Sequence, residues 1–158
     1  MVGRKDQPIK NVVLCAVLVS LFIPALIFFT VALSSGLSSP EALTALAEQY
    51  VSRKQNLLVI GMLSLLPVVL MVFVIWLIRK IKNRSADVRD LAIGGVAGIL
   101  AVDIWMNFEY WPTYLPERTY AGFPHGLEFV IGPIFYAPIA MVIGMVAAAM
   151  ASRRKASR

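Results

Sequence analysis

The residues best suited to chemistry stand at the end of a long apolar stretch. Residues 91–102 carry no charge, and Asp103 follows them, with Asn107 one helical turn on and Tyr110 close behind. At about 100° per residue, these three side chains share one face of a helix. A carboxyl group there could bind a proton or a cation, or it could accept a hydrogen bond that links two helices. The sequence leaves both roles open.

A second group of polar residues follows Asp103 in the chain, namely Glu109, Arg118, His125 and Glu128. His125 and Glu128 are three residues apart at the expected start of a helix, so they can face the same side. With Asp103 and Glu109 they would offer a metal one nitrogen and three carboxylates. Glu128 would also stabilise the helix N-terminus without a metal, because the helix dipole favours an acid there. We favour this capping role, and the sequence identifies no cofactor.

The depth of Asp103 in the membrane determines which surroundings its side chain needs. It lies about 18 Å along its apolar helix, past the middle of a bilayer. A charged side chain at the centre of a spanning helix costs about 2.5–3.5 kcal/mol, so contact with lipid is unfavourable. We therefore expect protein to shelter Asp103, either in its protonated form or beside a polar cavity or a donor group. Candidate donors are Asn107, Tyr110, Arg118 and His125.

Composition sets the class of protein. Of the 158 residues, 59% are hydrophobic and 15% are charged, whereas a soluble domain has about 25% charged residues. Mean hydropathy is +0.76, which indicates a membrane protein. The single cysteine, Cys15, excludes a disulfide-stabilised scaffold, and no repeat indicates a fibrous protein. The net charge of +6 comes from clusters at the ends of apolar runs, so we expect a lipid bilayer and no nucleic acid as partner.

Four apolar runs are long enough to cross a membrane, since a helix needs about 20 residues to span the hydrocarbon core. They predict an all-α membrane protein, a four-transmembrane-helix bundle that forms one integral membrane domain over residues 1–158. The first run could also be a signal peptide, but it is longer than the usual apolar region of about 7–15 residues, so we expect it to be retained. The predicted spans are residues 11–33, 55–78, 91–111 and 129–152.

The distribution of basic residues predicts the direction of the spans. Twelve of the 15 Lys and Arg residues lie in the two tails and in the loop between the second and third runs. Arg53, Lys54 and Arg118 lie on the other side. The positive-inside rule therefore predicts that the N and C termini are cytoplasmic. In a bacterium the chain would then lie in the inner (plasma) membrane, and an organellar membrane is the alternative.

The first outer loop contains the start signals of a short amphipathic helix. Ser39 is suited to the N-cap, Pro40 to the first helical position and Glu41 to the first turn. We expect this helix to cover the outer end of the bundle. Its apolar face would carry Leu43, Leu46 and Tyr50.

Prolines interrupt three of the four spans, at Pro24, Pro67, Pro133 and Pro138. Each proline removes a backbone donor and favours a kink. The kink expected in the fourth span lies at the depth of Asp103, where it could open a cavity as in transporters or be purely structural. Aromatic residues at the outer end fit an interfacial belt. They are Trp105, Trp111, Tyr114, Tyr120 and Phe123.

Small residues predict close contact between two helices. Gly94 and Gly98 lie roughly opposite Asp103 on the third span. Ala140, Gly144 and Ala148 repeat the same spacing on the fourth span, and such ridges let helix backbones approach closely. The two ridges could therefore face each other, with ordinary packing as the simplest explanation.

Missing signatures exclude several classes of small membrane protein. One cysteine excludes the oxidoreductases that use paired thiols, and one aspartate within a span excludes an intramembrane aspartyl protease. One histidine cannot supply both axial ligands of a haem. The motifs of serine hydrolases, phosphate-binding loops and zinc proteases do not occur.

Three functional hypotheses remain, and the two preferred ones describe a protein that is not an enzyme. The preferred one is a non-catalytic subunit that packs within a larger membrane complex. The second is a small oligomeric transporter or channel that uses Asp103 as an intramembrane proton or cation site. The third is an outer-leaflet membrane enzyme that uses Asp103, Glu109, His125 and Glu128. The expected protein partners are other membrane subunits or further copies of the chain.

Overall fold

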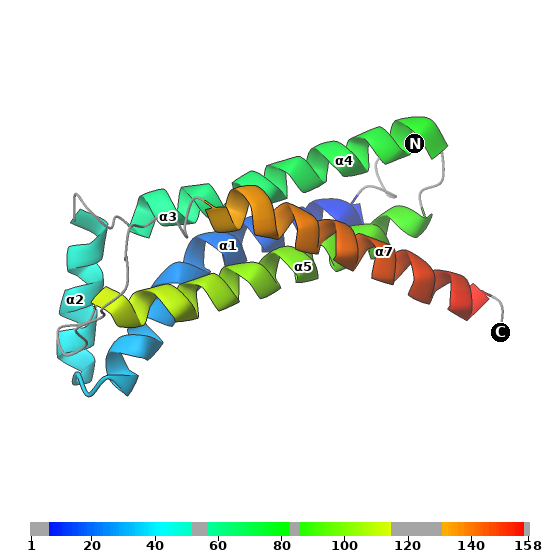
Figure 1. Ribbon diagram of the computed structural model, residues 1–158. Helices are drawn as coiled ribbons and strands as arrows, with labels where there is room; N and C mark the ends of the chain where they lie inside the picture. Colours follow the sequence, from blue (N-terminus) through cyan, green and yellow to red (C-terminus); the bar gives the residue numbers. More distant parts are fainter. Residues whose placement is uncertain (1–6, 52–56, 83–85, 115–130, 157–158) are drawn as a thin grey trace.

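Helices make up the fold. The computed structural model describes residues 7–51, 57–82, 86–114 and 131–156, and no strand occurs in these ranges. The helical elements, shown in Figure 1, are α1 (Gln7–Ser34), α2 (Ser39–Val51), α3 (Leu57–Ser64), α4 (Leu66–Lys82), α5 (Ala86–Tyr110), η1 (Trp111–Tyr114), η2 (Gly132–Tyr136) and α7 (Ala137–Ala156).

Four helical segments are long and apolar enough to cross a membrane. They confirm the four predicted spans and make the chain an integral membrane protein with an all-helical fold. The second span consists of α3 and α4 together, and the fourth consists of η2 and α7. The spans run over Ile9–Ser34, Leu57–Lys80, Val88–Tyr110 and Gly132–Arg154.

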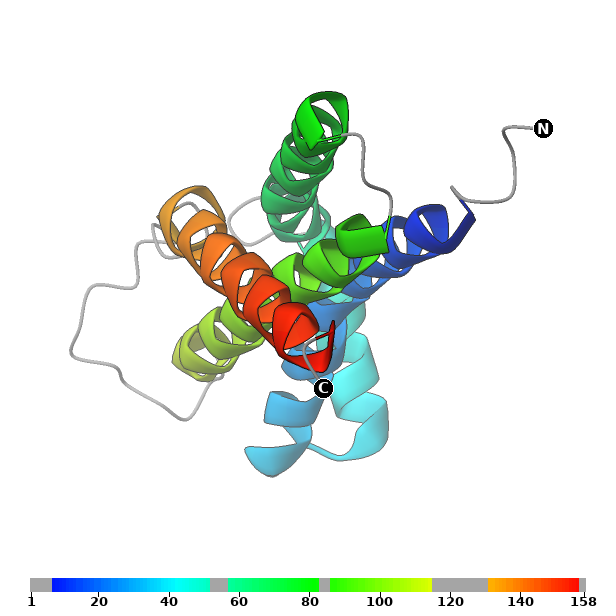
Figure 2. The same cartoon turned by 90° about the vertical axis from the view of Figure 1, so that its right-hand side faces the viewer.

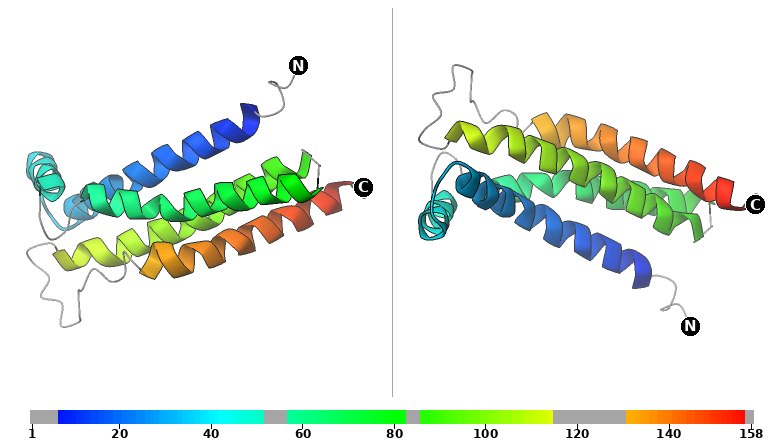
Figure 3. Two further views of the ribbon diagram at one scale, coloured as in Figure 1. Left: turned by 90° about the horizontal axis from the view of Figure 1, so that it is seen from above. Right: turned by 90° about the horizontal axis from the view of Figure 1, so that it is seen from below.

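The spans lie side by side, and α2 lies crosswise at one end of them (Figure 1). The start of α1 and the end of α7 both lie at the opposite end of the bundle (Figure 3). Helix α5 packs against α1, α4 and α7, and it passes between them when the bundle is seen from the end that carries both termini (Figure 2). The helix that carries Asp103 is therefore the central helix of the bundle.

A glycine turn ends α1 and redirects the chain into α2. Gly36 has φ +96°, a left-handed conformation that favours glycine. The N–H of Gly36 donates to the carbonyl of Leu33 at 3.1 Å, and the N–H of Leu37 donates to that of Ala32 at 3.2 Å. This pair of bonds is the Schellman arrangement, which satisfies the last carbonyls of a helix.

Helix α2 begins with a capping box. The N–H of Ala42 donates to the carbonyl of Ser38 at 2.9 Å, so Ser38 is the N-cap, and the prediction of Ser39 is wrong by one residue. Glu41 Oε2 accepts the Ser38 hydroxyl at 2.6 Å and the Ser38 backbone N–H at 2.8 Å. A glutamate three residues after the N-cap satisfies the cap in this way. The Ser38 hydroxyl, and then its N–H, hold the pKa of Glu41 below its ordinary value of 4.5.

The prolines break the second and fourth spans in different ways. In the second span, Leu65 forms a turn between α3 and α4, because Pro67 has no N–H with which to continue the helix. In the fourth span, the chain forms the π-helix η2, and the N–H of Ala137 donates to the carbonyl of Gly132. A π-helical segment lets the chain pass Pro138 with a local change of register. In contrast, α1 continues through Pro24.

The two ridges of small residues lie against each other. A Cβ on Gly94 would be 2.7 Å from the Cβ of Ala148, and one on Gly98 would be 2.9 Å from the backbone nitrogen of Met141. Both would also collide with backbone carbonyls of α7, those of Gly144 and Ala140. Helices α5 and α7 therefore approach so closely that only glycine fits at these positions of α5.

Candidate functional site

The buried core consists of two apolar clusters, one toward each end of the bundle. The cluster nearer α2, here called the α2-side cluster, includes Ile23, Phe28, Ile60 and Trp111. The cluster nearer the chain ends, here called the termini-side cluster, includes Ala16, Val68, Met71, Ile99 and Met141. In a bilayer, close packing of these side chains, and not their removal from water, holds the four spans together.

A polar layer separates the two clusters. It consists of Ser20 on α1, Ser64 at the end of α3 and Asp103 on α5, which are 0%, 2% and 3% exposed. Members of both clusters flank each of them on its own helix, as Ala16 and Ile23 flank Ser20. The three residues therefore lie at a similar depth. The expectation that protein shelters Asp103 is confirmed.

Ser20 and Asp103 form the centre of this layer. The Ser20 hydroxyl faces the Asp103 carboxyl, yet neither Ser20 Oγ nor Asp103 Oδ2 completes a hydrogen bond within the described part of the chain. Buried polar atoms in proteins are nearly always paired. Leaving one unpaired costs about 1–3 kcal/mol. These two oxygens are therefore available to bind something else.

Other hydroxyl groups on α1 show the ordinary alternative. Thr30 Oγ1 donates to the carbonyl of Leu26 at 2.8 Å, and Ser34 Oγ donates to that of Val31 at 2.8 Å. Such bonds to the preceding turn are how Ser and Thr usually satisfy themselves within a helix. Ser20 does not use this option, so its hydroxyl stays directed at Asp103.

Two buried prolines add backbone oxygens near the polar layer. Pro24 follows Ser20 by four residues, and it has no N–H to donate to the Ser20 carbonyl. Pro67 likewise has none for the carbonyl of Leu63, beside Ser64. Both prolines are fully buried. A carbonyl without its helical donor can interact with a bound ion or a proton donor, as at the broken helices of transporters.

Asn107 has a structural role at the α2 end of the same helix. Its Nδ2 donates to the backbone carbonyl of Asp103 at 2.8 Å, and its Oδ1 accepts the indole N–H of Trp111 at 2.9 Å. The Trp111 ring packs edge-on against Phe28 of α1, with ring centroids 4.9 Å apart. Asn107 therefore fixes the end of α5 against α1 and does not pair with the Asp103 carboxyl.

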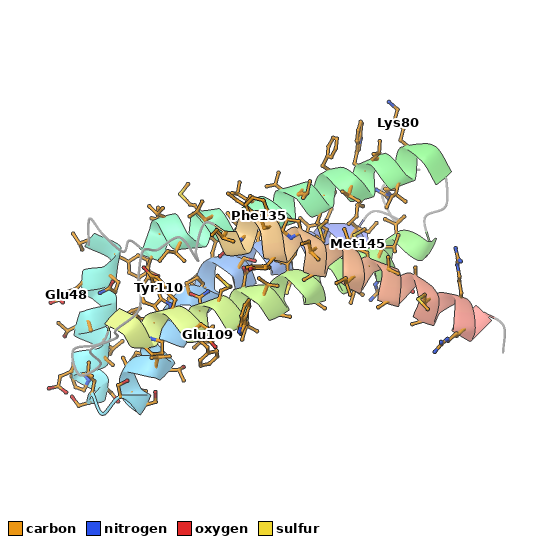
Figure 4. All side chains as sticks on the ribbon, in the orientation of Figure 1. Glu48, Lys80, Glu109, Tyr110, Phe135 and Met145 are labelled. Atoms are coloured by element: carbon orange, nitrogen blue, oxygen red, sulfur yellow. The ribbon has the colours of Figure 1, made fainter. Side chains whose placement is uncertain are left out.

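The remaining predicted site residues are not all brought together. Tyr110 is 6% exposed and belongs to the α2-side cluster, where its ring lies 5.2 Å from that of Trp111. Glu109 is exposed on α5 (Figure 4), away from the buried face that carries Asp103. Arg118, His125 and Glu128 lie outside the described residues, and so do Tyr120 and Phe123.

The two described tryptophans of the predicted aromatic belt differ in exposure. Trp105 is 52% exposed, and its ring lies 6.1 Å from that of Tyr136, as a lipid-facing aromatic side chain would. Trp111 is 0% exposed, so its assignment to the belt is wrong. Asn107 satisfies its indole N–H, and a tryptophan whose N–H is paired can be buried in a core.

Within residues that the structure describes, no group of three or more His, Cys, Asp or Glu side chains could hold a metal ion. A multi-carboxylate metal centre around Asp103 therefore finds no support there. The polar oxygens at the depth of Asp103 are the neutral hydroxyl groups of Ser20 and Ser64.

The sequence reasoning missed Ser20 and Ser64. Serine is common in membrane helices, so residue type alone does not mark these two. A usable signal was nevertheless present, because each serine stands one helical turn before a proline in an otherwise apolar span. That pattern places a hydroxyl next to a backbone carbonyl that has lost its donor.

No family model, no curated protein and no solved structure matches this chain. The fold alone does not define a function. What the chain does must therefore be argued from the chemistry of the polar layer.

Proposed function

We propose that this membrane protein is a small transporter or channel in which Asp103 binds a proton or a cation. The observation that carries the proposal is the pair of buried oxygens, Ser20 Oγ and Asp103 Oδ2, which face each other without a completed hydrogen bond. An ionisable residue sheltered inside a membrane protein is typical of ion pathways and proton relays.

The alternative role of Asp103 is a hydrogen-bonded link between helices. A link stabilises a bundle only when its polar atoms are satisfied, since a buried unpaired group is destabilising. Asn107 already joins α5 to Trp111 with two hydrogen bonds of 2.8 and 2.9 Å. A second link that leaves Asp103 Oδ2 and Ser20 Oγ unpaired would weaken the structure, which favours a ligand-binding role.

The moving part of such a transporter is most naturally the irregular start of the fourth span. Helix α7 packs on the glycine face of α5, roughly opposite Asp103 on that helix. The irregular segments of the bundle are the π-helix η2, the break at Leu65 and Pro24 within α1. Helix η2 contacts α5 about one turn beyond Asp103, where Gly132 lies against Met106, so we keep the gating role with the fourth span.

Localisation and direction are part of the proposal. With both termini cytoplasmic by the positive-inside rule, α2 lies on the outer side of the membrane. Helix α2 then caps the end of the bundle at the outer surface, with exposed Leu43 and Tyr50 toward lipid headgroups. In a bacterium the protein would lie in the inner membrane.

A non-catalytic subunit is the second candidate. The two small-residue ridges are not free to bind a neighbouring protein, because they are occupied by the α5–α7 contact. The observation that still favours this candidate is the exposed apolar surface of the fourth span, which includes Phe135 of η2 and Ile139 and Ile143 of α7. Native mass spectrometry of the gently extracted protein separates the two candidates, because a subunit carries fixed partners and a transporter appears alone or as a homo-oligomer.

An outer-leaflet enzyme receives the least support. Glu109, one of its four proposed residues, is exposed on another face of α5 than Asp103, so these two carboxyl groups do not form a pair. A general acid and base must both reach one substrate. Glu109 therefore cannot act together with Asp103 in such a reaction.

The test of transport uses purified protein in liposomes. A potassium diffusion potential, negative inside, drives uptake, and a trapped pH dye and radiolabelled Na⁺ report protons and cations separately. We expect wild-type protein to increase uptake and Asp103→Asn to abolish the increase, since the amide cannot take up a proton or neutralise a cation.

The matched control is Asp90→Asn, the same change at an exposed position of the same helix, where the Asp90 carboxylate accepts a hydrogen bond from Ser152. This variant should retain wild-type flux. Equal flux in Asp103→Asn and wild-type liposomes, or no flux with correctly folded wild-type protein, would contradict the proposal.

A further inference from the structure

We infer that the polar layer is a dehydrated Na⁺ site formed by Ser20, Ser64 and Asp103. The inference rests on the proposed function and names its ligand. It starts from two side chains that are each at least 97% buried, with the Ser20 hydroxyl facing the Asp103 carboxyl and an unpaired oxygen on each.

Charge balance selects a monovalent ion. Asp103 is the one ionisable side chain of the polar layer, and an isolated charge in an apolar interior is strongly unfavourable. One positive charge neutralises the carboxylate. A divalent ion would leave an excess charge at the same place, and the described residues contain no cluster of three or more acidic, His or Cys side chains to balance it.

The donor set selects a metal ion over a proton. A proton on Asp103 would satisfy a single acceptor, whereas the layer offers several oxygens at a similar depth. A hard cation binds carboxylate, hydroxyl and carbonyl oxygens together. The available oxygens are the Asp103 carboxylate, the hydroxyl groups of Ser20 and Ser64, and the Ser20 carbonyl that Pro24 leaves without its helical donor.

The number of ligands favours a small ion. The layer offers one carboxylate, two hydroxyl groups and one freed carbonyl, and such a small set of oxygens suits the Na⁺ ion better than the larger K⁺ ion. The flanking apolar clusters, with Ile23 on one side and Ile99 on the other, would keep the bound ion away from bulk water.

The experiment measures equilibrium binding of radiolabelled Na⁺ to purified full-length protein in detergent, without any flux. Unlabelled Na⁺ or K⁺ competes, and an organic cation keeps the ionic strength constant. We expect saturable binding that Na⁺ displaces and equal K⁺ does not. Asp103→Asn should abolish it. Ser20→Ala and Ser64→Ala should each weaken it about tenfold, as expected for the loss of one ligand to a charged group.

Ser34→Ala is the matched control, because it removes a hydroxyl from α1 that bonds within its own helix. It should bind Na⁺ like the wild type. Wild-type affinity in both Ser20→Ala and Ser64→Ala, no saturable binding to folded wild-type protein, or equal displacement by K⁺ would overturn the inference.

The results also separate the two proposals. Na⁺ binding in detergent without uptake into liposomes would leave the site standing and contradict transport. Proton uptake that depends on Asp103, without Na⁺ binding, would support transport and overturn the Na⁺ site. Size-exclusion chromatography of each variant verifies the fold, and two independent serine variants keep the test decisive if one of them fails to fold.

Discussion

At the scale of single residues, the hydroxyl of Ser20 is the most informative group in the molecule. Ser20 is 0% exposed and its Oγ has no hydrogen-bond partner within the described residues. A residue kept for stability alone would not carry this penalty. Functional sites commonly retain such locally unfavourable groups, with the rest of the fold supplying the stability.

Ser20→Ala therefore has a predicted effect on stability that depends on Na⁺. Without Na⁺ the variant should be about 1 kcal/mol more stable than the wild type, since it loses a buried unpaired hydroxyl. With saturating Na⁺ the order should reverse, because ligand binding stabilises the wild type more. Thermal unfolding followed by tryptophan fluorescence measures both conditions.

Ser34→Ala is again the control, and its stability should not respond to Na⁺ differently from the wild type. A loss of stability in Ser20→Ala without Na⁺ would mean that the hydroxyl serves as a structural hydrogen bond. That result would restore the interpretation of Asp103 as a link between helices.

The site was only partly predictable from the sequence at this scale. Asp103 stands out because a carboxyl group within an apolar run is costly. Ser20 was missed because its importance comes from a contact with another helix, which depends on how α1 and α5 pack. Glu109 was included because it is near in sequence, yet six residues at ~100° each place it on another face.

At the scale of helices, hydropathy and length were sufficient to predict the four spans, since a lipid-spanning helix must be long and apolar. The irregularities were harder to predict. Pro24, Pro67 and Pro138 have the same local effect, but the chain responds with a continuous helix, a turn and a π-helix respectively. The response depends on the neighbouring helices that satisfy the freed backbone groups.

The close contact of α5 with α7 predicts different outcomes for two glycines. Gly98→Ala places a Cβ against the backbone of Ala140, which cannot yield, so we expect stability to fall by about 3 kcal/mol. Gly95→Ala places a Cβ 3.0 Å from the flexible Met71 Sδ. There the gain in helix propensity, about 1 kcal/mol, should offset most of the strain.

Thermal unfolding of the two variants beside the wild type measures the difference. Because both substitutions are Gly→Ala on the same helix, the gain in helix propensity is similar for both variants and cancels when their stabilities are compared. Similar stability of Gly95→Ala and Gly98→Ala would show that α5 and α7 do not approach as closely as this structure has them.

The start of α2 should respond to pH. Its capping bond depends on the Glu41 carboxylate, whose pKa the Ser38 hydroxyl and N–H lower. The bond should therefore be intact above the ordinary value of 4.5 and should weaken only as pH falls below it. The amide resonance of Ser38, followed by NMR during an acid titration, reports the midpoint. Ser38→Ala should move that midpoint upward, and an unchanged midpoint would contradict the capping geometry.

At the scale of the whole molecule, the even number of spans brings the start of α1 and the end of α7 to the same end, opposite α2 (Figure 3). The positive-inside rule predicts the side of the membrane on which that end lies, since twelve of the 15 Lys and Arg residues belong to the two tails and to the loop between the second and third spans. Lys80, which lies 5.4 Å from the centre of the Trp76 ring, fits an interfacial anchor there.

Labelling of single cysteines tests this direction. Cys15, the exposed native cysteine, is first changed to serine. Glu48→Cys on α2 and Lys80→Cys on α4 then form a matched pair, since both positions are exposed and lie at opposite ends of the bundle (Figure 4). In intact cells a membrane-impermeant maleimide should label position 48 at once and position 80 only after the membrane is opened.

The positive-inside rule requires this order, because basic ends stay in the cytoplasm. The reverse order would place α2 in the cytoplasm and the basic ends outside, and would contradict the direction of the spans that we propose.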